Sequence, residues 1–130
     1  MHIDDRVLVL EVDKQDTHLK MSIFEHKDIA QTLRHYSQIA FSPVEVNKLS
    51  LEIKTILNKA DKSGILEDES MAELKKTGGL LWSHLFTRQV KERLRASSIR
   101  NLILSLDDEL IGFPWELAFD GDDFICLKFN

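Results

Sequence analysis

The stretch NLILSLDDELIGFPWELAFDGDDFICLKFN, residues 101–130, decides the fold class of this chain. It begins with an almost uninterrupted apolar run at residues 101–106, which has the length of a strand. A half-buried strand alternates apolar with polar residues, whereas a continuous apolar run is typical of a strand covered on both faces. We therefore expect residues 101–106 to form a central parallel strand of an α/β domain.

The rest of this stretch predicts a short helix, a turn and another strand. Pro114 favours the first position of a short helix through residues 115–117, because its fixed φ suits a helix start. Asp120 and Gly121 favour a turn. Residues 124–129 are mostly apolar and are expected to form a final strand.

The chain is expected to open with an antiparallel hairpin. Residues 6–12 are rich in residues that favour strands, and residues 19–24 alternate apolar with polar side chains. The polar residues 13–17 between them have the length of a hairpin loop.

A helix is expected to follow the hairpin. Ser42 is a suitable cap and Pro43 a suitable first residue. The helix is expected to end near residues 61–64. Apolar residues recur at helical spacing within it: Val46, Leu49, Ile53, Ile56, Leu57 and Ala60.

A second helical region is expected over residues 68–97, with Gly78 and Gly79 inside it. Each glycine costs roughly 1 kcal/mol relative to alanine in a helix interior. The pair therefore marks either a break in the helix or a place where another backbone packs very closely. We expect a break.

Composition favours one folded domain and gives no electrostatic reason to expect nucleic acid as a partner. The chain has 130 residues, of which 43% are hydrophobic and 30% charged, and a net charge of -5. The lone cysteine cannot form an internal disulfide. No signal-peptide pattern and no apolar run of membrane-spanning length is present, so we expect a cytoplasmic protein with no membrane partner.

The residues with reactive side chains do not form a familiar catalytic or metal-binding pattern. Cys126 lies between two apolar residues of the expected final strand, where a thiol behaves as a small buried hydrophobe. His84 is expected to be a partly buried structural residue. None of the histidines has the i, i+4 spacing of a helical metal pair or a cysteine nearby in sequence: His2, His18, His26, His35 and His84.

Two acidic groups remain as possible cation ligands, but turn residues are the stronger interpretation, because aspartate competes for backbone donors in turns. These groups are Asp107, Asp108 and Glu109, and Asp120, Asp122 and Asp123. We therefore predict no catalytic residue, no cofactor and no metal site in this chain.

The sequence GGLLWSHLFTRQVKERLRAS, followed by IRNLILSLDDELIGFPWELAFDGDDFICLKF, resembles the first part of a CHAT domain, the caspase-like module often found beside TPR repeats. The resemblance covers most of the chain, is weakest in residues 1–66 and is strongest in residues 78–130. It is carried by a set of structural motif residues: Gly79, Trp82, Pro114, Trp115, Glu116, Asp120, Gly121 and Phe124.

The resemblance implies that residues 1–130 form a single partial CHAT-like domain, the N-terminal half of a caspase-like α/β fold. In that family the catalytic histidine and cysteine come later, in a His-Gly element and after a further buried strand, and neither is in this sequence. The chain is then the scaffold segment of a CHAT-type cysteine endopeptidase, inert by itself. Trp82 and Trp115 are expected in the core or an interface. Glu116 is expected to cap the short helix or pair with an arginine, with a role near a basic substrate residue as the alternative.

Two other interpretations stay open. A half sheet has an open edge, and such edges pair with another chain or a second copy. The chain is then a non-catalytic interaction module, whose partner is the missing C-terminal half of the domain, a TPR-like region or itself as a homodimer. The other interpretation is an unrelated small α/β domain that only imitates the motif.

Overall fold

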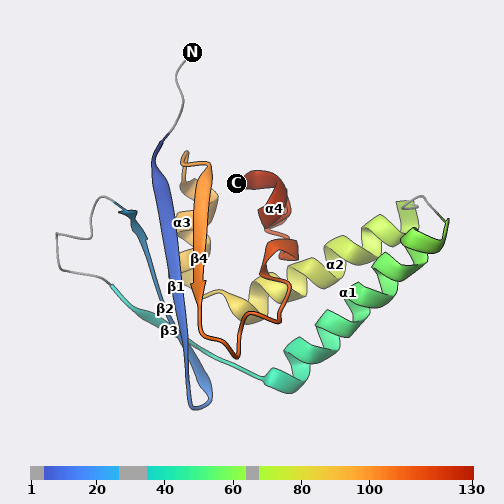
Figure 1. Ribbon diagram of the computed structural model, residues 1–130, viewed down its shortest axis with the longest axis horizontal. Coiled ribbons are helices and arrows are strands. Elements are labelled where there is room, and N and C mark those ends of the chain that lie inside the picture. Colours follow the sequence, from blue (N-terminus) through green and yellow to red (C-terminus); the bar gives the residue numbers. More distant parts are fainter. Residues whose placement is uncertain (1–4, 27–34, 64–67) are drawn as a thin grey trace.

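The structure, a computed structural model, describes residues 5–26, 35–63 and 68–130. It confirms a mixed α/β architecture, with a sheet on one side and helices on the other (Figure 1). In chain order the elements are β1 (Val7–Gln15), β2 (His18–Glu25), β3 (Ser37–Ala40), α1 (Pro43–Ser63), α2 (Asp68–Leu85), α3 (Arg88–Ala96), β4 (Asn101–Leu106), the 3₁₀ turn η2 (Trp115–Leu117) and α4 (Ile125–Lys128).

The four strands form one sheet in the order β3-β2-β1-β4. β1 pairs antiparallel with β2 and parallel with β4, and β2 pairs antiparallel with β3. The parallel pairing expected for residues 101–106 is therefore confirmed. Their expected central position is wrong, because β4 is one of the two edge strands of the sheet that the described residues form, and β1 and β2 are its inner strands.

The opening hairpin is confirmed, but its strands are longer and its loop is shorter than expected. Gln15 pairs with His18, so the turn itself contains only two residues, Asp16 and Thr17. Asp16 has a φ of 53°, in the left-handed region that aspartate enters more readily than most side chains. Most of the polar stretch therefore continues the strands.

One face of the sheet contributes its apolar side chains to the core cluster. Leu8, Leu10 and Val12 of β1 are fully buried in a core cluster that also holds side chains from all four α-helices. In β4, Leu104 packs against this cluster, whereas Ile103 on the opposite face is 51% exposed. The expectation that residues 101–106 are covered on both faces is therefore wrong, and the continuous apolar run conceals an alternating pattern.

The helices α1 and α2 form a long hairpin that reaches away from the sheet (Figure 1). α1 begins as expected, because the Ser42 carbonyl accepts a hydrogen bond from the N–H of Val46 at 3.1 Å and its hydroxyl accepts from Glu45 at 3.3 Å. The two helices share an apolar seam that includes Ile53 and Leu74.

α2 runs without a break through Gly78 and Gly79, so the expected break there is wrong. The second helical region divides later, at Phe86 and Thr87. Thr87 caps α3, because its hydroxyl accepts a hydrogen bond from the N–H of Val90 at 3.2 Å.

The final strand expected at residues 124–129 is also wrong. Phe124 makes a single antiparallel bridge with Phe119, after which the chain forms the one-turn helix α4. Ile125 and Phe129 are buried at a spacing of four residues, whereas Leu127 between them is 74% exposed. This is the periodicity of a helical turn, and a run of six residues is too short to distinguish it from a strand in sequence.

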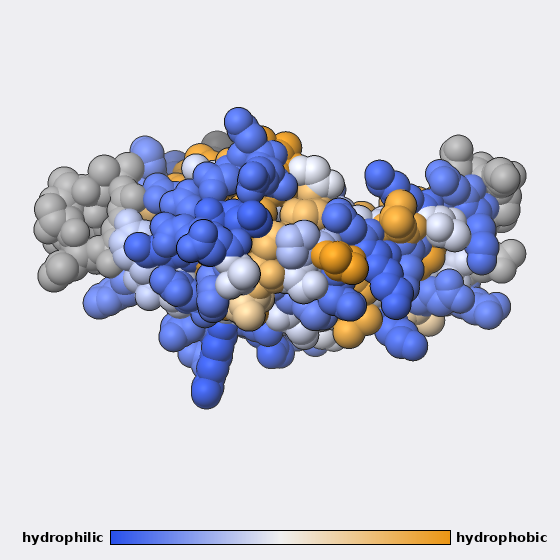
Figure 2. Space-filling model, turned by 90° about the horizontal axis from the view of Figure 1, so that it is seen from below, coloured by the Kyte–Doolittle hydropathy of each residue, from blue (hydrophilic) through white to orange (hydrophobic). Residues whose placement is uncertain are grey.

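The surface seen from below is mostly hydrophilic, with apolar residues in small, separate patches (Figure 2). A docking site of the kind that needs a broad apolar patch is therefore not indicated on this face. Within residues 5–26, 35–63 and 68–130, no helix combines the length and the apolar character needed to span a bilayer.

Candidate interaction site at the free edge of the sheet

The C-terminal segment is held against α2 at Gly78. The N–H of Phe119 donates a hydrogen bond to the carbonyl of Gly78 at 2.9 Å. A Cβ on Gly78 would meet the carbonyl oxygen of Leu117 at 2.5 Å, whereas one on Gly79 would meet nothing within 4 Å. Close backbone packing is therefore confirmed as the role of Gly78. Gly79, the glycine chosen from the resemblance, is not at this contact.

The two tryptophans lie in the core. Trp115 is 1% exposed, and its indole Nε1–H donates to the carbonyl of Leu110 at 2.9 Å. Its ring packs edge-on against the Phe86 ring, with 5.4 Å between the ring centroids. The Phe86 ring also packs against the Trp82 ring, with a centroid distance of 4.9 Å. The expectation of core aromatics is confirmed for both tryptophans. The polar end of Trp115 is satisfied, so the ring anchors the 107–113 loop over the sheet.

Pro114 and Glu116 flank Trp115 in the expected short helix, which the structure confirms as η2. The carbonyl of Pro114 accepts a hydrogen bond from the N–H of Leu117 at 3.0 Å. Glu116 is exposed, and in the part of the chain that the structure describes its carboxylate has neither a cap contact nor an ion pair. The expectation that it caps the helix or pairs with an arginine is not met there.

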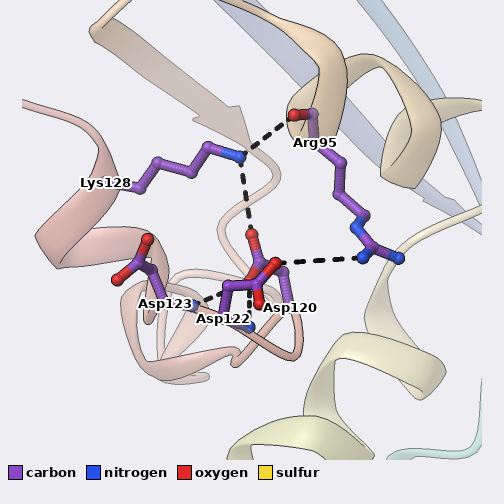
Figure 3. A network of polar contacts seen from close by, with 5 residues as sticks. All are labelled: Arg95, Asp120, Asp122, Asp123 and Lys128. Carbon is purple, nitrogen blue, oxygen red and sulfur yellow. Dashed lines mark hydrogen bonds and ion pairs between the residues drawn. The ribbon is translucent and has the colours of Figure 1, made fainter.

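Asp120 organises the turn before α4, as Figure 3 shows. One carboxylate oxygen, Oδ1, accepts hydrogen bonds from the N–H groups of Asp122 at 2.8 Å and Asp123 at 2.9 Å. Gly121 has a φ of +105°, a conformation that favours glycine. The expected aspartate-glycine turn is confirmed, and Phe124 follows it with a buried ring against Phe119.

The second oxygen of Asp120, Oδ2, lies 3.5 Å from the ammonium of Lys128, which also donates to the carbonyl of Arg95 at 3.3 Å (Figure 3). Burial alone would raise the pKa of Asp120, but hydrogen bonds from Asp123 and Asp122 and the charge of Lys128 outweigh it, so the pKa lies below its ordinary value. The network joins α4 to the end of α3 and identifies Asp120 as a structural carboxylate.

Asp107 and Glu109 bind the hairpin. The N–H of Lys14 donates to Asp107 Oδ2 at 2.8 Å, and the Lys14 ammonium lies 3.4 Å from Glu109. Partial burial and the neighbouring Asp107 carboxylate raise the pKa of Asp13. Among the described residues, no three histidine, cysteine, aspartate or glutamate side chains are placed to hold a metal ion.

Cys126 is exposed on α4, so the expectation of a buried strand thiol is wrong. Its sulfur has no hydrogen bond to a histidine in the described ranges. His84 is half-buried in α2, as expected. His18 contacts the Thr17 hydroxyl at 3.1 Å in the hairpin turn, and His2 lies outside the described residues. Nothing in this arrangement activates the thiol.

Asn130 lies beside the start of β4, on the side away from β1. Its N–H donates to the carbonyl of Arg100 at 2.7 Å, and its carbonyl accepts from the N–H of Leu102 at 3.1 Å. These two bonds are the pattern by which one residue pairs in parallel with a strand, here with Asn101 opposite. The side-chain amide of Asn130 adds a contact to Asn101 at 3.2 Å.

Among the described residues, none forms a backbone hydrogen bond with the rest of this edge of β4. Successive strand residues point their N–H and C=O groups to opposite sides, and Leu102 points toward Asn130. Leu104 and Leu106 therefore also point outward. The N–H of Asp107 confirms the alternation, because it donates to Val12 of β1 at 3.3 Å. This outer edge of β4, from Leu102 to Leu106, is the candidate interaction site.

Comparison of the chain with protein-family models, curated proteins and solved structures found no match. The candidate site therefore depends on the geometry of this chain. Sequence reasoning predicted an open sheet edge but did not place it at β4, and it missed the roles of Thr87, Lys128 and Asn130. The helical spacing of Ile125 and Phe129 is the sequence signal from which α4, and with it the return of Asn130 to β4, could have been predicted.

Proposed function

We propose that this chain is a non-catalytic scaffold module whose sheet is completed by another polypeptide at the outer edge of β4. The parallel pairing of Asn130 with Asn101 supports the proposal, because these two main-chain hydrogen bonds form on the outer edge of β4 within the chain itself. Unpaired strand edges readily add a further strand through main-chain hydrogen bonds. The tryptophans and the Asp120 turn act as supports for this geometry.

A scaffold role predicts that the purified chain does not cleave peptides. The exposed Cys126 thiol has no activating histidine hydrogen-bonded to it in the described residues, which supports this role. We expect no turnover of a fluorogenic peptide library, with or without a reducing agent, and the same result for Cys126→Ser. Thiol-dependent cleavage by the original chain that Cys126→Ser abolishes would overturn the proposal.

A second candidate is the scaffold segment of a CHAT-type caspase-like cysteine endopeptidase. The sequence resemblance favours this candidate. The structural roles of Pro114–Leu117 in the short helix and of Asp120 in the following turn agree with it. A reducing cytoplasm suits the exposed thiol of either candidate. The coding sequence beyond residue 130 is the test. A His-Gly element and a later cysteine after an apolar strand support this candidate, and a sequence lacking them contradicts it.

A further inference from the structure

The hairpin that α1 and α2 form beside the sheet (Figure 1) carries a groove of about 600 Å³. Two of its lining residues are leucines with much of their surface in water, since Leu51 is 62% and Leu80 is 43% exposed. We propose that this groove binds the same groove of a second copy of the chain, so that the two hairpins form a four-helix bundle. Half of the lining residues are charged: Lys48, Glu52, Lys59, Glu73 and Lys76.

The order of the residues along the groove follows from the opposite directions of the two helices. Residues equally far from the end of α1 and from the start of α2 lie at about the same level. Leu51 lies 12 residues before the end of α1, and Leu80 lies 12 residues after the start of α2, so the two leucines share a level. Lys59 and Glu73, which lie four and five residues from these ends, share a second level.

A two-fold axis parallel to the helices brings these levels into register in two copies. It lays α1 of each chain antiparallel on α2 of the other, as neighbouring helices lie in up-down four-helix bundles. Leu51 and Leu80 of both chains then form a layer of four leucines. Ile56 and the methyl groups of Thr55 and Thr77, which also line the groove, extend the apolar centre beyond this layer.

The charges of the groove complement one another in this arrangement. Lys59 of each chain faces Glu73 of the other, so lysine and glutamate alternate around the bundle at that level. Glu52 of each chain lies less than one helical turn along the axis from Lys76 of the other. Within the part of the chain that the structure describes, no ion pair already engages these four side chains. Complementary charges on both surfaces favour this register over others.

The reversed orientation of the second copy is less favourable. A two-fold axis perpendicular to the helices would lay α1 of each chain on α1 of the other. With the two grooves centred on each other, Lys48 of one chain would then lie toward Lys59 of the other, and like charges repel. The apolar part of the groove is narrow, so we expect a small contact and a dissociation constant in the micromolar to millimolar range.

Sedimentation equilibrium of the intact chain tests the contact. The mass is expected to rise from that of one chain toward that of two as the concentration is raised from about 1 μM to about 1 mM. Leu80→Asp places a charge in the leucine layer and is expected to weaken the dimer at least about tenfold. Leu57→Asp is the matched control, because Leu57 is 41% exposed but does not line the groove. It is expected to leave the dimer intact.

Two charge variants test the register. Glu52→Lys/Glu73→Lys leaves only lysines at the four paired positions, and Lys59→Glu/Lys76→Glu leaves only glutamates there. Each variant alone is expected to weaken the dimer at least about tenfold, because like charges then face one another. An equimolar mixture of the two is expected to restore a dimer at least as tight as that of the original chain. Circular dichroism checks that each variant is folded.

Lys54→Glu/Lys75→Glu controls for net charge, because both lysines lie on the same helices but do not line the groove. This variant is expected to keep the dimer. A mass that stays that of one chain up to about 1 mM would overturn the inference. A dimer that both charge variants leave intact, or that their mixture does not restore, would place the contact elsewhere and overturn it too. Neither result bears on the proposed function, because the groove is separate from the outer edge of β4.

Discussion

Gly78 and Gly79 are neighbours in α2 with different surroundings, and this difference predicts opposite effects of the same substitution. In Gly78→Ala the new Cβ meets the Leu117 carbonyl oxygen at 2.5 Å and the Cβ of Phe119 at 3.1 Å. We expect a loss of about 1–3 kcal/mol in the free energy of unfolding, as in overpacked cores. Gly79→Ala meets nothing within 4 Å and is expected to gain about 0.5–1 kcal/mol.

Urea unfolding of the two alanine variants beside the original chain measures this difference. Each variant serves as the control for the other, because both change the intrinsic helix propensity of α2 equally. Stabilisation by both substitutions would contradict the close contact at Gly78.

Asp120 gives the chain a stability that depends on pH in an identifiable direction. The pKa of Asp120 is lower in the folded chain than its ordinary value, because its hydrogen bonds and Lys128 outweigh the opposing effect of burial. The folded state therefore binds this proton less tightly than the unfolded state. The resulting stabilisation is complete above the pKa of Asp120 in the unfolded chain, at about pH 4. It is lost as the pH falls through the lower pKa of Asp120 in the folded chain.

The variant Asp120→Asn removes this charge while keeping an oxygen for the turn. We expect a loss of about 1.5–3 kcal/mol at pH 7, the range for hydrogen bonds to charged groups, and a smaller loss as the solution is acidified below about pH 4. Asp123→Asn is the control, since the exposed Asp123 contributes backbone groups to the turn. A pH-independent loss in Asp120→Asn would contradict the assignment of the effect to charge.

At the scale of elements, the boundary between α2 and α3 depends on Thr87. Its hydroxyl accepts from Val90 and lies 2.7 Å from the hydroxyl of Ser37, so one side chain caps α3 and contacts β3. We expect Thr87→Ala to cost about 0.5–2 kcal/mol in thermal or urea unfolding, and Thr87→Ser to cost less because it keeps the cap. Equal costs for the two variants would assign the effect to the lost methyl group instead.

The elements also show what the sequence can predict. The hairpin, α1 and η2 were predictable because their signals are local: a polar turn, Ser42 before Pro43, and the proline before Trp115. The continuity of α2 was not, because the backbone that packs on Gly78 comes from residues about forty positions later. α4 was mistaken for a strand because its short apolar run carries no decisive period.

At the scale of the whole molecule, the layering could not be read from residues 101–106. Their apolar character fits a central strand that is buried on both faces, and it fits an edge strand with one covered face equally well. The structure separates the two because Leu104 faces the core and Ile103 is 51% exposed. The candidate site could not be read from these residues either, because it depends on Asn130 returning to β4 after a turn and a helix.

The two faces of the sheet are expected to respond differently to the loss of side-chain volume. Leu10 of β1 is fully buried in the core cluster, so Leu10→Ala is expected to cost about 2–5 kcal/mol. Ile103→Ala on the exposed face is expected to cost less than about 1.5 kcal/mol, because much of the side chain already contacts water. Circular dichroism during urea unfolding measures both.

If Leu10→Ala leaves no folded population, Leu10→Val provides the core value with a smaller cavity. Similar costs at Leu10 and Ile103 in the isolated chain would show that both faces of the sheet are packed, which contradicts the one-sided core. A cost at Ile103 that rises with protein concentration would show that a second copy covers this face. We expect the cost at Ile103 to stay small and independent of concentration, because Ile103 is half exposed and lies outside the core cluster that contains Leu10.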